Sequence, residues 1–203
     1  MAQTLKEDIK HRIDNAALTT FCDMGYQGAV MADIARNAGI SVGNIYRYYK
    51  SKEELFSELV PRDIIDTLRE MIGSKFMIAD GMELENARHA PAMDLMDERL
   101  FEYLVAYRRQ VIIIMEEREG NPYHGFKDEL VDLMTRMAMR YTDTIDHPVH
   151  IDELKGRMLR LIYENLYDAI VEILKSFTRT DEIKAAFGNI LDYHFFGVSG
   201  FMK

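Results

Sequence analysis

The stretch GAVMADIARNAGISVGNIYRYYKSKEEL, residues 28–55, decides the fold of this chain. Its apolar residues recur at helical spacing over residues 31–38 and again over residues 42–49. A third helix follows directly, since Ser51 and Glu54 have the spacing of a capping box. The stretch therefore predicts two short helices joined by a tight turn and followed by a capped helix, which is the arrangement of a helix-turn-helix.

The tight turn depends on Gly39. A glycine after the last periodic residue accepts the left-handed conformation that closes a helix, without the steric cost of a β-carbon. Ile40 then supplies a hydrophobic contact, and the Ser41 hydroxyl is placed to cap the next helix. We predict that Ile45 anchors that helix in the core.

The second short helix carries side chains suited to a DNA surface. Small residues at its start permit close approach to the major groove. Arg47 can bind guanine through two hydrogen bonds, and Asn44 can bind adenine. The hydroxyls of Tyr46 and Tyr48 and the ammonium of Lys52 can reach phosphates. The alternative is an ordinary three-helix core in which the tyrosines only pack. The predicted DNA-binding residues are Met31, Ala32, Ser41, Val42, Gly43, Asn44, Tyr46, Arg47, Tyr48 and Lys52.

This stretch resembles the DNA-binding domain of the tetracycline-repressor (TetR) family of transcriptional regulators. The resemblance covers roughly the first quarter of the chain. It implies an all-α fold, with a three-helix helix-turn-helix domain over residues 1–51 and a larger helical body over residues 52–203 that binds an effector and dimerises. The matching segments are Gly25-Tyr26, Asp33-Ile34-Ala35, Ala38-Gly39-Ile40-Ser41, Gly43-Asn44-Ile45-Tyr46, Tyr48-Tyr49 and Ser51-Lys52-Glu53-Glu54-Leu55.

Val30 departs from the family pattern. The family usually has a Ser or Thr at this position, which caps the second helix and contacts a phosphate. That contact is therefore lost here, or it is supplied by the backbone amides of Met31 and Ala32.

Charge divides the chain into two regions. Residues 1–62 carry eight Lys or Arg and eight Asp or Glu, so the whole net charge of −9 belongs to residues 63–203. We call residues 1–62 the head. A neutral head attached to an acidic remainder of the chain favours one docking orientation on DNA. It also implies modest non-specific affinity and a need for paired half-sites.

Other features point to a soluble cytoplasmic protein. Cys22 is the single cysteine, which excludes an internal disulfide and suits a reducing compartment. The sequence contains neither an apolar run of membrane-spanning length nor a signal-peptide core at its polar start.

Helical periodicity continues through the rest of the chain. A connector helix is expected over residues 52–72, with a kink at Pro61, and joins the head to the body. An irregular or partly helical connection is expected over residues 73–91. Further helices are predicted over residues 92–119 (one bent helix or two), 124–144, 151–177 and 180–198.

The last two predicted helices carry more apolar surface than one buried stripe requires. That surface either closes the monomer's own core or pairs with a second chain. We favour a homodimer, because two heads related by a two-fold axis would meet successive major grooves of a pseudo-palindrome; the resemblance implies the same four-helix interface. The predicted interface residues are Leu154, Met158, Leu161, Ile162, Ile170, Phe187, Ile190, Leu191 and Phe195.

Methionine and tyrosine side chains of the body could form a small-molecule pocket. The same residues would also fill a core, and the sequence leaves both interpretations open. Arg108 and Arg109 could bind an anionic ligand or pair with Glu102 or Glu116. The candidate effector-binding residues are Tyr103, Tyr107, Met115, Met134, Met137, Tyr141 and Tyr163.

The sequence contains little that indicates catalysis or metal binding. His147 and His150 stand near carboxylates but lack the spacing of a zinc site. Nucleophile-elbow, Walker and dinucleotide motifs are missing, so we expect neither an enzyme nor a cofactor. The sequence predicts a homodimeric DNA-binding repressor controlled by an unidentified small-molecule effector. The alternative is an effector-independent helix-turn-helix or architectural protein.

Overall fold

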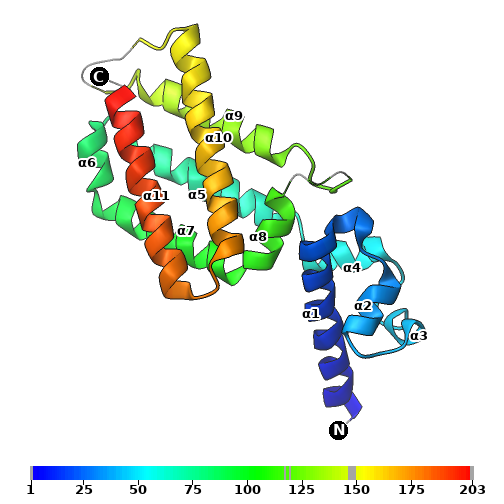
Figure 1. Ribbon diagram of the computed structural model, residues 1–203. Helices are drawn as coiled ribbons and strands as arrows, with labels where there is room; N and C mark the ends of the chain where they lie inside the picture. The colour runs from blue at the N-terminus through cyan, green and yellow to red at the C-terminus, as the bar shows by residue number, and fades with distance from the viewer. Residues whose placement is uncertain (1, 117, 119, 146–149, 202–203) are drawn as a thin grey trace. The chain divides into compact units, whose positions relative to one another are not determined.

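A computed structural model describes residues 2–116, 118, 120–145 and 150–201 of the chain. These residues form helices and connecting loops, with no strand among them (Figure 1). The helices are α1 (Ala2–Gly28), α2 (Met31–Asn37), α3 (Val42–Ile45), α4 (Lys52–Leu59), α5 (Asp63–Ala79), α6 (Leu84–Arg88), α7 (Pro91–Ala106), α8 (Arg108–Met115), α9 (Phe126–Tyr141), α10 (Glu153–Ser176) and α11 (Thr180–Phe201).

The helices belong to two compact units. The first unit comprises the chain up to residue 65 together with residues 109–124, and the second comprises residues 66–108 and 125–203. The first unit thus takes in α4 and nearly all of α8, which a boundary at residue 51 assigns to the body. The division at residue 51 stays a prediction.

The core of the first unit is built on α1. One face of this helix is buried, including Ile13 and Phe21. The Phe21 ring meets Phe56 of α4 edge to face, with ring centroids 5.2 Å apart. Tyr26 joins the same cluster, 4.8 Å from Phe56. Aromatic pairs at these distances add to the hydrophobic stabilisation, and they fix α4 against α1.

The turn between α2 and α3 has the predicted geometry. Gly39 has a φ of +67°, and the Ile40 amide donates to the Ala35 carbonyl at 2.9 Å. The Ser41 hydroxyl accepts from the Asn44 amide at 3.3 Å and caps α3. Arg12 of α1 donates to the Gly39 carbonyl at 3.2 Å, and it also donates to the preceding carbonyl. The turn is therefore tied to α1.

The start of α4 confirms the predicted capping box, with one difference in partner. The Ser51 hydroxyl accepts from the Glu54 amide at 3.2 Å. The Glu54 carboxylate accepts from the Lys50 amide at 2.5 Å, one residue before the N-cap. Both bonds satisfy amides that a helix start would leave unpaired.

The predicted connector helix over residues 52–72 is wrong in its form. It is two helices, because α4 ends at Leu59 and α5 begins at Asp63, on either side of Pro61. A proline inside a helix lacks the N–H for one hydrogen bond, and its ring clashes with the preceding turn. The chain resolves this conflict by a break, where the sequence predicted a kink.

The predicted connection over residues 73–91 is also largely helical. α5 passes through Gly73 and ends at Ala79, and α6 follows before Pro91. A glycine inside a helix costs about 1 kcal/mol relative to alanine. Burial of the apolar face of α5, with Leu68 and Ala79 almost fully covered, offsets that cost.

The second unit has long helices packed side by side, with α10 lying against both α9 and α11. The stripe predicted on α9 is buried at Phe126, Leu130 and Met134. Arg108 closes the end of α10, since its guanidinium donates to the Leu174 carbonyl at 2.6 Å and to a second carbonyl after the helix end. The Arg108 guanidinium is therefore bound by backbone carbonyls, where the sequence had suggested an anionic ligand or a glutamate as its partner.

Gly39→Ala should lower the free energy of unfolding by about 1–2 kcal/mol, because an L residue pays that cost in the left-handed region. The new β-carbon would also stand 2.9 Å from the Arg12 guanidinium. Chemical denaturation of the full chain, followed by far-ultraviolet circular dichroism, measures the change.

Gly43→Ala is the matched control, since a β-carbon there meets nothing within 4 Å. We expect unchanged stability or a gain of up to about 1 kcal/mol, because alanine favours helices more than glycine does. Equal losses in the two variants would contradict the account of the turn.

Candidate functional site

The surface formed by α2, the turn and α3 presents the predicted DNA-binding side chains. Arg47 is exposed and makes no ion pair within the part of the chain that the structure describes. Tyr46 and Val42 are 49% and 40% exposed, respectively, and Gly43 is exposed between them. Asn44 and Tyr48 are half-buried beside them. The helix predicted over residues 42–49 is shorter, since α3 ends at Ile45 and a turn follows it. A cation and polar groups are thus exposed on α3 and on that turn.

Val30 lies at the N-cap of α2 without a side-chain cap. Its backbone is extended, with a φ of −122°, and its side chain accepts no hydrogen bond. The Val30 carbonyl accepts from the Asp33 and Ile34 amides, at 3.0 and 3.2 Å. The amides of Met31 and Ala32 are first-turn donors outside the helical ladder, so the two alternatives, a lost phosphate contact or one made by these amides, both stay predictions.

Lys52 has a structural role that the sequence did not indicate. Its ammonium donates to the carbonyls of Tyr26 and Ala29, at 2.7 and 3.0 Å. The nitrogen also lies 4.4 Å from the centroid of the Tyr26 ring. Lys52 therefore closes the C-terminal end of α1. An ammonium has three donors, so the phosphate contact stays a prediction that rests on the third.

A polar network holds the segment that follows α3. The Tyr49 hydroxyl donates to Asp14 at 2.5 Å, and Lys10 contacts both Asp14 and Glu58, at 3.2 and 2.8 Å. Burial, together with the hydrogen bond to Asp14, raises the pKa of Tyr49 above its usual range, so the phenol remains a donor. Lys10 therefore stabilises this unit from within.

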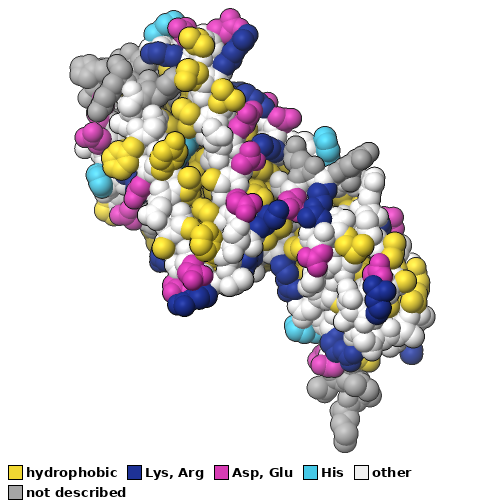
Figure 2. Space-filling model, in the orientation of Figure 1, with side chains coloured by type: hydrophobic (Ala, Val, Ile, Leu, Met, Phe, Trp, Pro, Cys, Tyr) yellow, Lys and Arg dark blue, Asp and Glu magenta, His cyan; other side chains and the backbone are white. Residues whose placement is uncertain are grey.

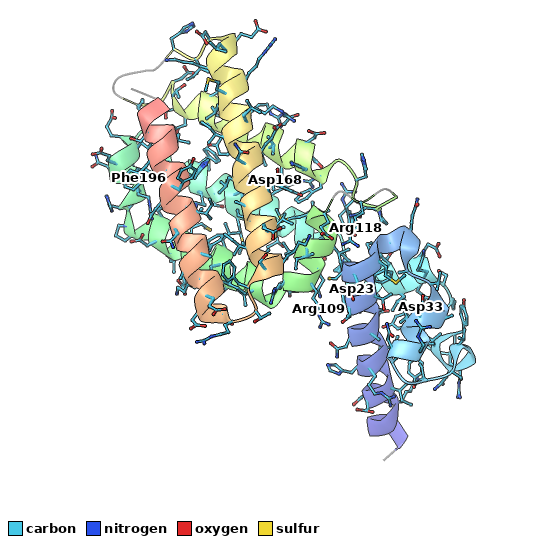
Figure 3. All side chains as sticks on the ribbon, in the orientation of Figure 1. Asp23, Asp33, Arg109, Arg118, Asp168 and Phe196 are labelled. Atoms are coloured by element: carbon cyan, nitrogen blue, oxygen red, sulfur yellow. The ribbon has the colours of Figure 1, made fainter. Side chains whose placement is uncertain are left out.

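The segment of residues 109–124 is anchored to α1 by two arginines (Figure 3). Arg109 donates to the Asn15 side chain at 2.8 Å, and Arg118 donates to the Asp23 carbonyl at 2.7 Å. The Cys22 thiol points to the Arg109 carbonyl at 3.5 Å. Burial raises the pKa of Cys22 to about 11, which favours the protonated thiol at neutral pH.

All nine predicted interface residues lie on α10 and α11, where hydrophobic side chains reach the surface (Figure 2). Leu154 and Leu161 are 67% and 56% exposed. Phe187 instead packs inside its own unit, 5.9 Å from the Phe101 ring. Phe196, which belongs to the apolar arc of the sequence, is also exposed on α11, as is Tyr193, which the sequence did not single out. Met158 is exposed too, whereas Ile162, Ile170, Ile190, Leu191 and Phe195 are partly buried.

The second unit contains a cavity of about 140 Å³. Among the predicted effector-binding residues only Tyr163 lines it. The Tyr141 hydroxyl is instead hydrogen-bonded to the Met82 carbonyl at 2.7 Å, and Met115 belongs to the first unit. The wall residues are Lys75, Ala79, Leu84, Ala87, Arg88, Met93, Asp97, Tyr163, Leu191, His194, Phe195 and Val198.

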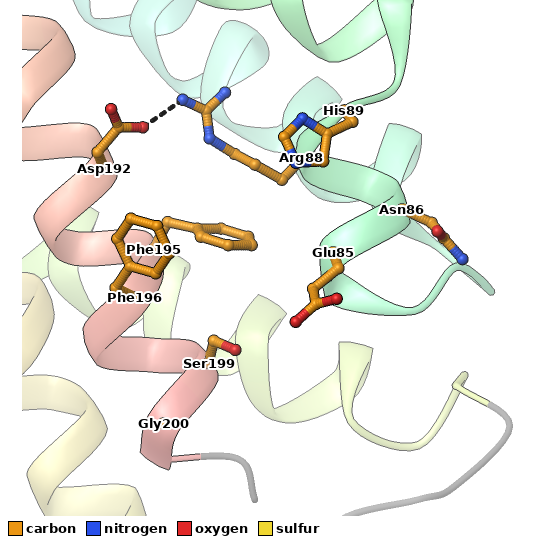
Figure 4. Close-up of a pocket in the computed structure, with 9 residues that line it drawn as sticks. All are labelled: Glu85, Asn86, Arg88, His89, Asp192, Phe195, Phe196, Ser199 and Gly200. Atoms are coloured by element: carbon orange, nitrogen blue, oxygen red, sulfur yellow. Dashed lines mark hydrogen bonds and ion pairs between the residues drawn. The ribbon is translucent and has the colours of Figure 1, made fainter.

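The second unit also has an outer groove of about 710 Å³, whose lining residues are drawn in Figure 4. Arg88 and Phe195 line both spaces. The Arg88 guanidinium donates to Asp192 at 2.5 Å and lies 5.9 Å from the Phe195 ring. The groove is therefore bordered by an ion pair and by aromatic surface.

A metal centre gains no support from the described residues, among which no three His, Cys, Asp or Glu side chains could hold an ion. His147 of the weak histidine pair lies outside them. None of the helices formed by these described residues combines the length and the apolarity that a bilayer span requires.

Comparison with known proteins agrees with this geometry. Residues 13–59 match the family described as "Bacterial regulatory proteins, tetR family". The HTH-type transcriptional regulator BetI of Cronobacter sakazakii is 38% identical over 66 residues, which are 32% of this chain and 32% of BetI. The chain thus matches about a third of that relative's length.

Longer matches extend into the body. IcaR of Staphylococcus aureus, a negative transcriptional regulator of the biofilm operon icaADBC, is 25% identical over 78% of this chain and 77% of its own. A TetR-like transcriptional regulator from Rhodococcus sp. RHA1 has the same fold, with a TM-score of 0.53 and 18% identity, covering 95% of this chain and 96% of that chain.

The exposed α3, the capped turn and the matched segment define a helix-turn-helix domain of the kind that DNA-binding transcriptional regulators carry. The similarity to the TetR family covers residues 13–59, the segment that contains α2, α3 and α4.

Arg47→Ala should weaken binding to the preferred DNA sequence by about 1–3 kcal/mol and relax the base preference at one position, as loss of a bidentate base contact does. Arg36→Ala is the control, because Arg36 is also exposed but pairs with Asp33 at 2.6 Å. Fluorescence anisotropy on a set of single-base variants measures both effects. Unchanged specificity in the Arg47 variant would mean that Arg47 does not read bases.

Lys52→Ala should lower the free energy of unfolding by about 1–3 kcal/mol, because it removes charge-assisted hydrogen bonds to two helix-end carbonyls. If the third donor also meets a phosphate, the slope of log affinity against log salt should flatten by about one unit. Denaturation and salt titration separate the two roles. A stability loss with an unchanged slope would leave Lys52 with the structural role alone.

His194 should make stability depend on pH. Burial, with Lys75 nearby, lowers the pKa of His194 to about 4, whereas an unfolded histidine titrates near 6.5. Between these values the unfolded chain binds more protons, so the free energy of unfolding falls as the pH drops from about 6.5 towards 4. Denaturation between pH 7.5 and 5 measures this effect. The free energy of unfolding of His194→Gln should depend less on pH than that of the wild type. His89→Gln, at an exposed position, should keep the wild-type dependence.

Proposed function

We propose that this protein is a homodimeric transcriptional repressor that acts in the cytoplasm, binds a pseudo-palindromic operator through α3 of each copy, and is controlled by a small molecule. The observation that carries the DNA-binding part is the exposed surface of α3 and of the turn after it, where Arg47 makes no ion pair with any described residue. The negative regulator IcaR, similar over most of the chain, supports repression.

The need for two copies follows from electrostatics. Lys10, Arg12 and Lys52 are engaged in contacts within the first unit, so few cations are free to bind phosphates. Each phosphate contact contributes to affinity through counterion release. A second head doubles these contacts and adds a second half-site, about one helical turn away.

The exposed apolar face of α10 and α11 supports the dimer. Apolar patches of this kind mark association surfaces in soluble proteins, and a two-fold interface pairs one patch with its own copy. Leu161 lies on this face, on the helix for which the sequence predicted the interface.

Leu161→Glu should convert the dimer to a monomer at micromolar concentration, because a charge would be buried without a partner. Leu95→Glu is the control, since Leu95 is similarly exposed, at 62% against 56%, but lies on α7. Sedimentation velocity measures the mass of each variant. A dimeric Leu161 variant, or dissociation caused equally by the Leu95 variant, would contradict the proposed interface.

Effector control is supported by the cavity in the second unit. A filled body would have favoured the effector-independent alternative. Two helices cross between the units along the chain, since α5 begins before residue 66 and α8 begins before residue 109. These helices are the route by which a ligand would bias the heads, provided that it binds two conformations with different affinity.

The experiment that tests the function is selection of binding sites from random DNA with the purified full chain. The expected product is one pseudo-palindrome whose half-site centres lie about 10 base pairs, or a multiple, apart. Recovery of unrelated sequences would favour the architectural alternative. Screening of small molecules for release of the selected DNA then tests effector control separately.

A further inference from the structure

The cavity in the second unit has the size of one aromatic ring. Its volume is about 140 Å³, and an apolar protein cavity of roughly 150 Å³ accepts benzene. Its walls come from α5, α6, α7, α10 and α11. Most of the wall is apolar, formed by side chains such as Ala79, Ala87, Met93, Leu191 and Val198.

Tyr163 presents a polar group to this apolar space. The side chain is 5% exposed and lines the cavity. Its hydroxyl has no hydrogen-bond partner among the residues that the structure describes. His194 lines the same wall, with its ring centroid 5.0 Å from that of Tyr163. Since no fully buried side-chain oxygen or nitrogen of the described residues lacks a partner, this unbonded hydroxyl is accessible and can pair with a ligand in the cavity.

The charged groups at the cavity are already matched. The Lys75 ammonium forms an ion pair with Asp97. Arg88 pairs with Asp192 at 2.5 Å and lies 3.8 Å from Asp97. An anionic ligand would have to displace a carboxylate, and a cationic ligand would meet Lys75 and Arg88. The wall therefore favours a neutral ligand.

We propose that this cavity binds a neutral molecule of one aromatic ring that carries a hydroxyl group, a phenol, with that hydroxyl hydrogen-bonded to Tyr163. The proposal rests on the effector control proposed above and assigns its site and ligand class. The outer groove, which shares Arg88 and Phe195 with the cavity, gives the ring its entrance and leaves space for a further substituent.

The first experiment compares three probes of equal ring size and different charge. Phenol, benzoate and benzylammonium are titrated into the full chain at pH 7, with isothermal calorimetry as the readout. Phenol is neutral at this pH, since phenolic hydroxyls titrate near 10. We expect phenol to bind at least about tenfold more tightly than either ion, because neither ion finds an unmatched counter-charge.

Substitutions of cavity residues test whether phenol binds in the cavity. Tyr163→Phe should weaken phenol binding about threefold to tenfold, the range for one neutral hydrogen bond. Tyr141→Phe is the matched control, because its hydroxyl is bonded to the Met82 carbonyl and it does not line the cavity; phenol affinity should not change. Ala87→Leu fills the space from α6 and should abolish binding, with circular dichroism confirming that the variant folds.

Absence of phenol binding, tighter binding of either ion, or equal effects of the two tyrosine variants would overturn the proposal. Its failure is separable from failure of the proposed function. Phenol that binds without releasing the selected DNA would leave the cavity assignment intact and remove phenol as an effector. Release of that DNA by a molecule that still acts on the Ala87→Leu variant would place effector control elsewhere.

Discussion

The left-handed turn at Gly39 is the constraint on which the DNA-binding surface depends. A φ of +67° lets the chain reverse direction within three residues, and Ser41 then caps α3. Arg12 holds the turn from α1 through two carbonyls. Arg47 lies in the turn after α3, where the buried Ile45 and Tyr49 flank it and its own side chain is left to solvent.

The first unit uses several of its cations to hold itself together. Lys52 closes the end of α1, and Lys10 joins two carboxylates beside Tyr49. A lysine that is hydrogen-bonded or ion-paired within the unit contributes less to phosphate binding. The head, which has no net charge by composition, therefore has fewer cations available for DNA than the sequence suggests. Affinity in the account proposed here comes from a few base and backbone contacts, made twice.

Local signals predicted the helix-turn-helix because its determinants are adjacent in the sequence. The glycine at residue 39 and the caps at Ser41 and Ser51 all act within four residues, and all three are confirmed. Contacts between distant residues could not be predicted in this way. Examples are the ammonium of Lys52 on α1 carbonyls and the cavity wall, where Tyr163 meets residues from four other helices. The helix through Gly73 was missed because its stabilising burial is tertiary.

The central claim is that Arg47 reads a base in the major groove, and methylation protection of guanine N7 on the selected DNA tests it most directly. The account predicts one protected guanine in each half-site with the wild-type protein, and loss of that protection when Arg47→Ala is bound at saturating concentration. Protection that persists in the variant, or that is absent with the wild type, would contradict it.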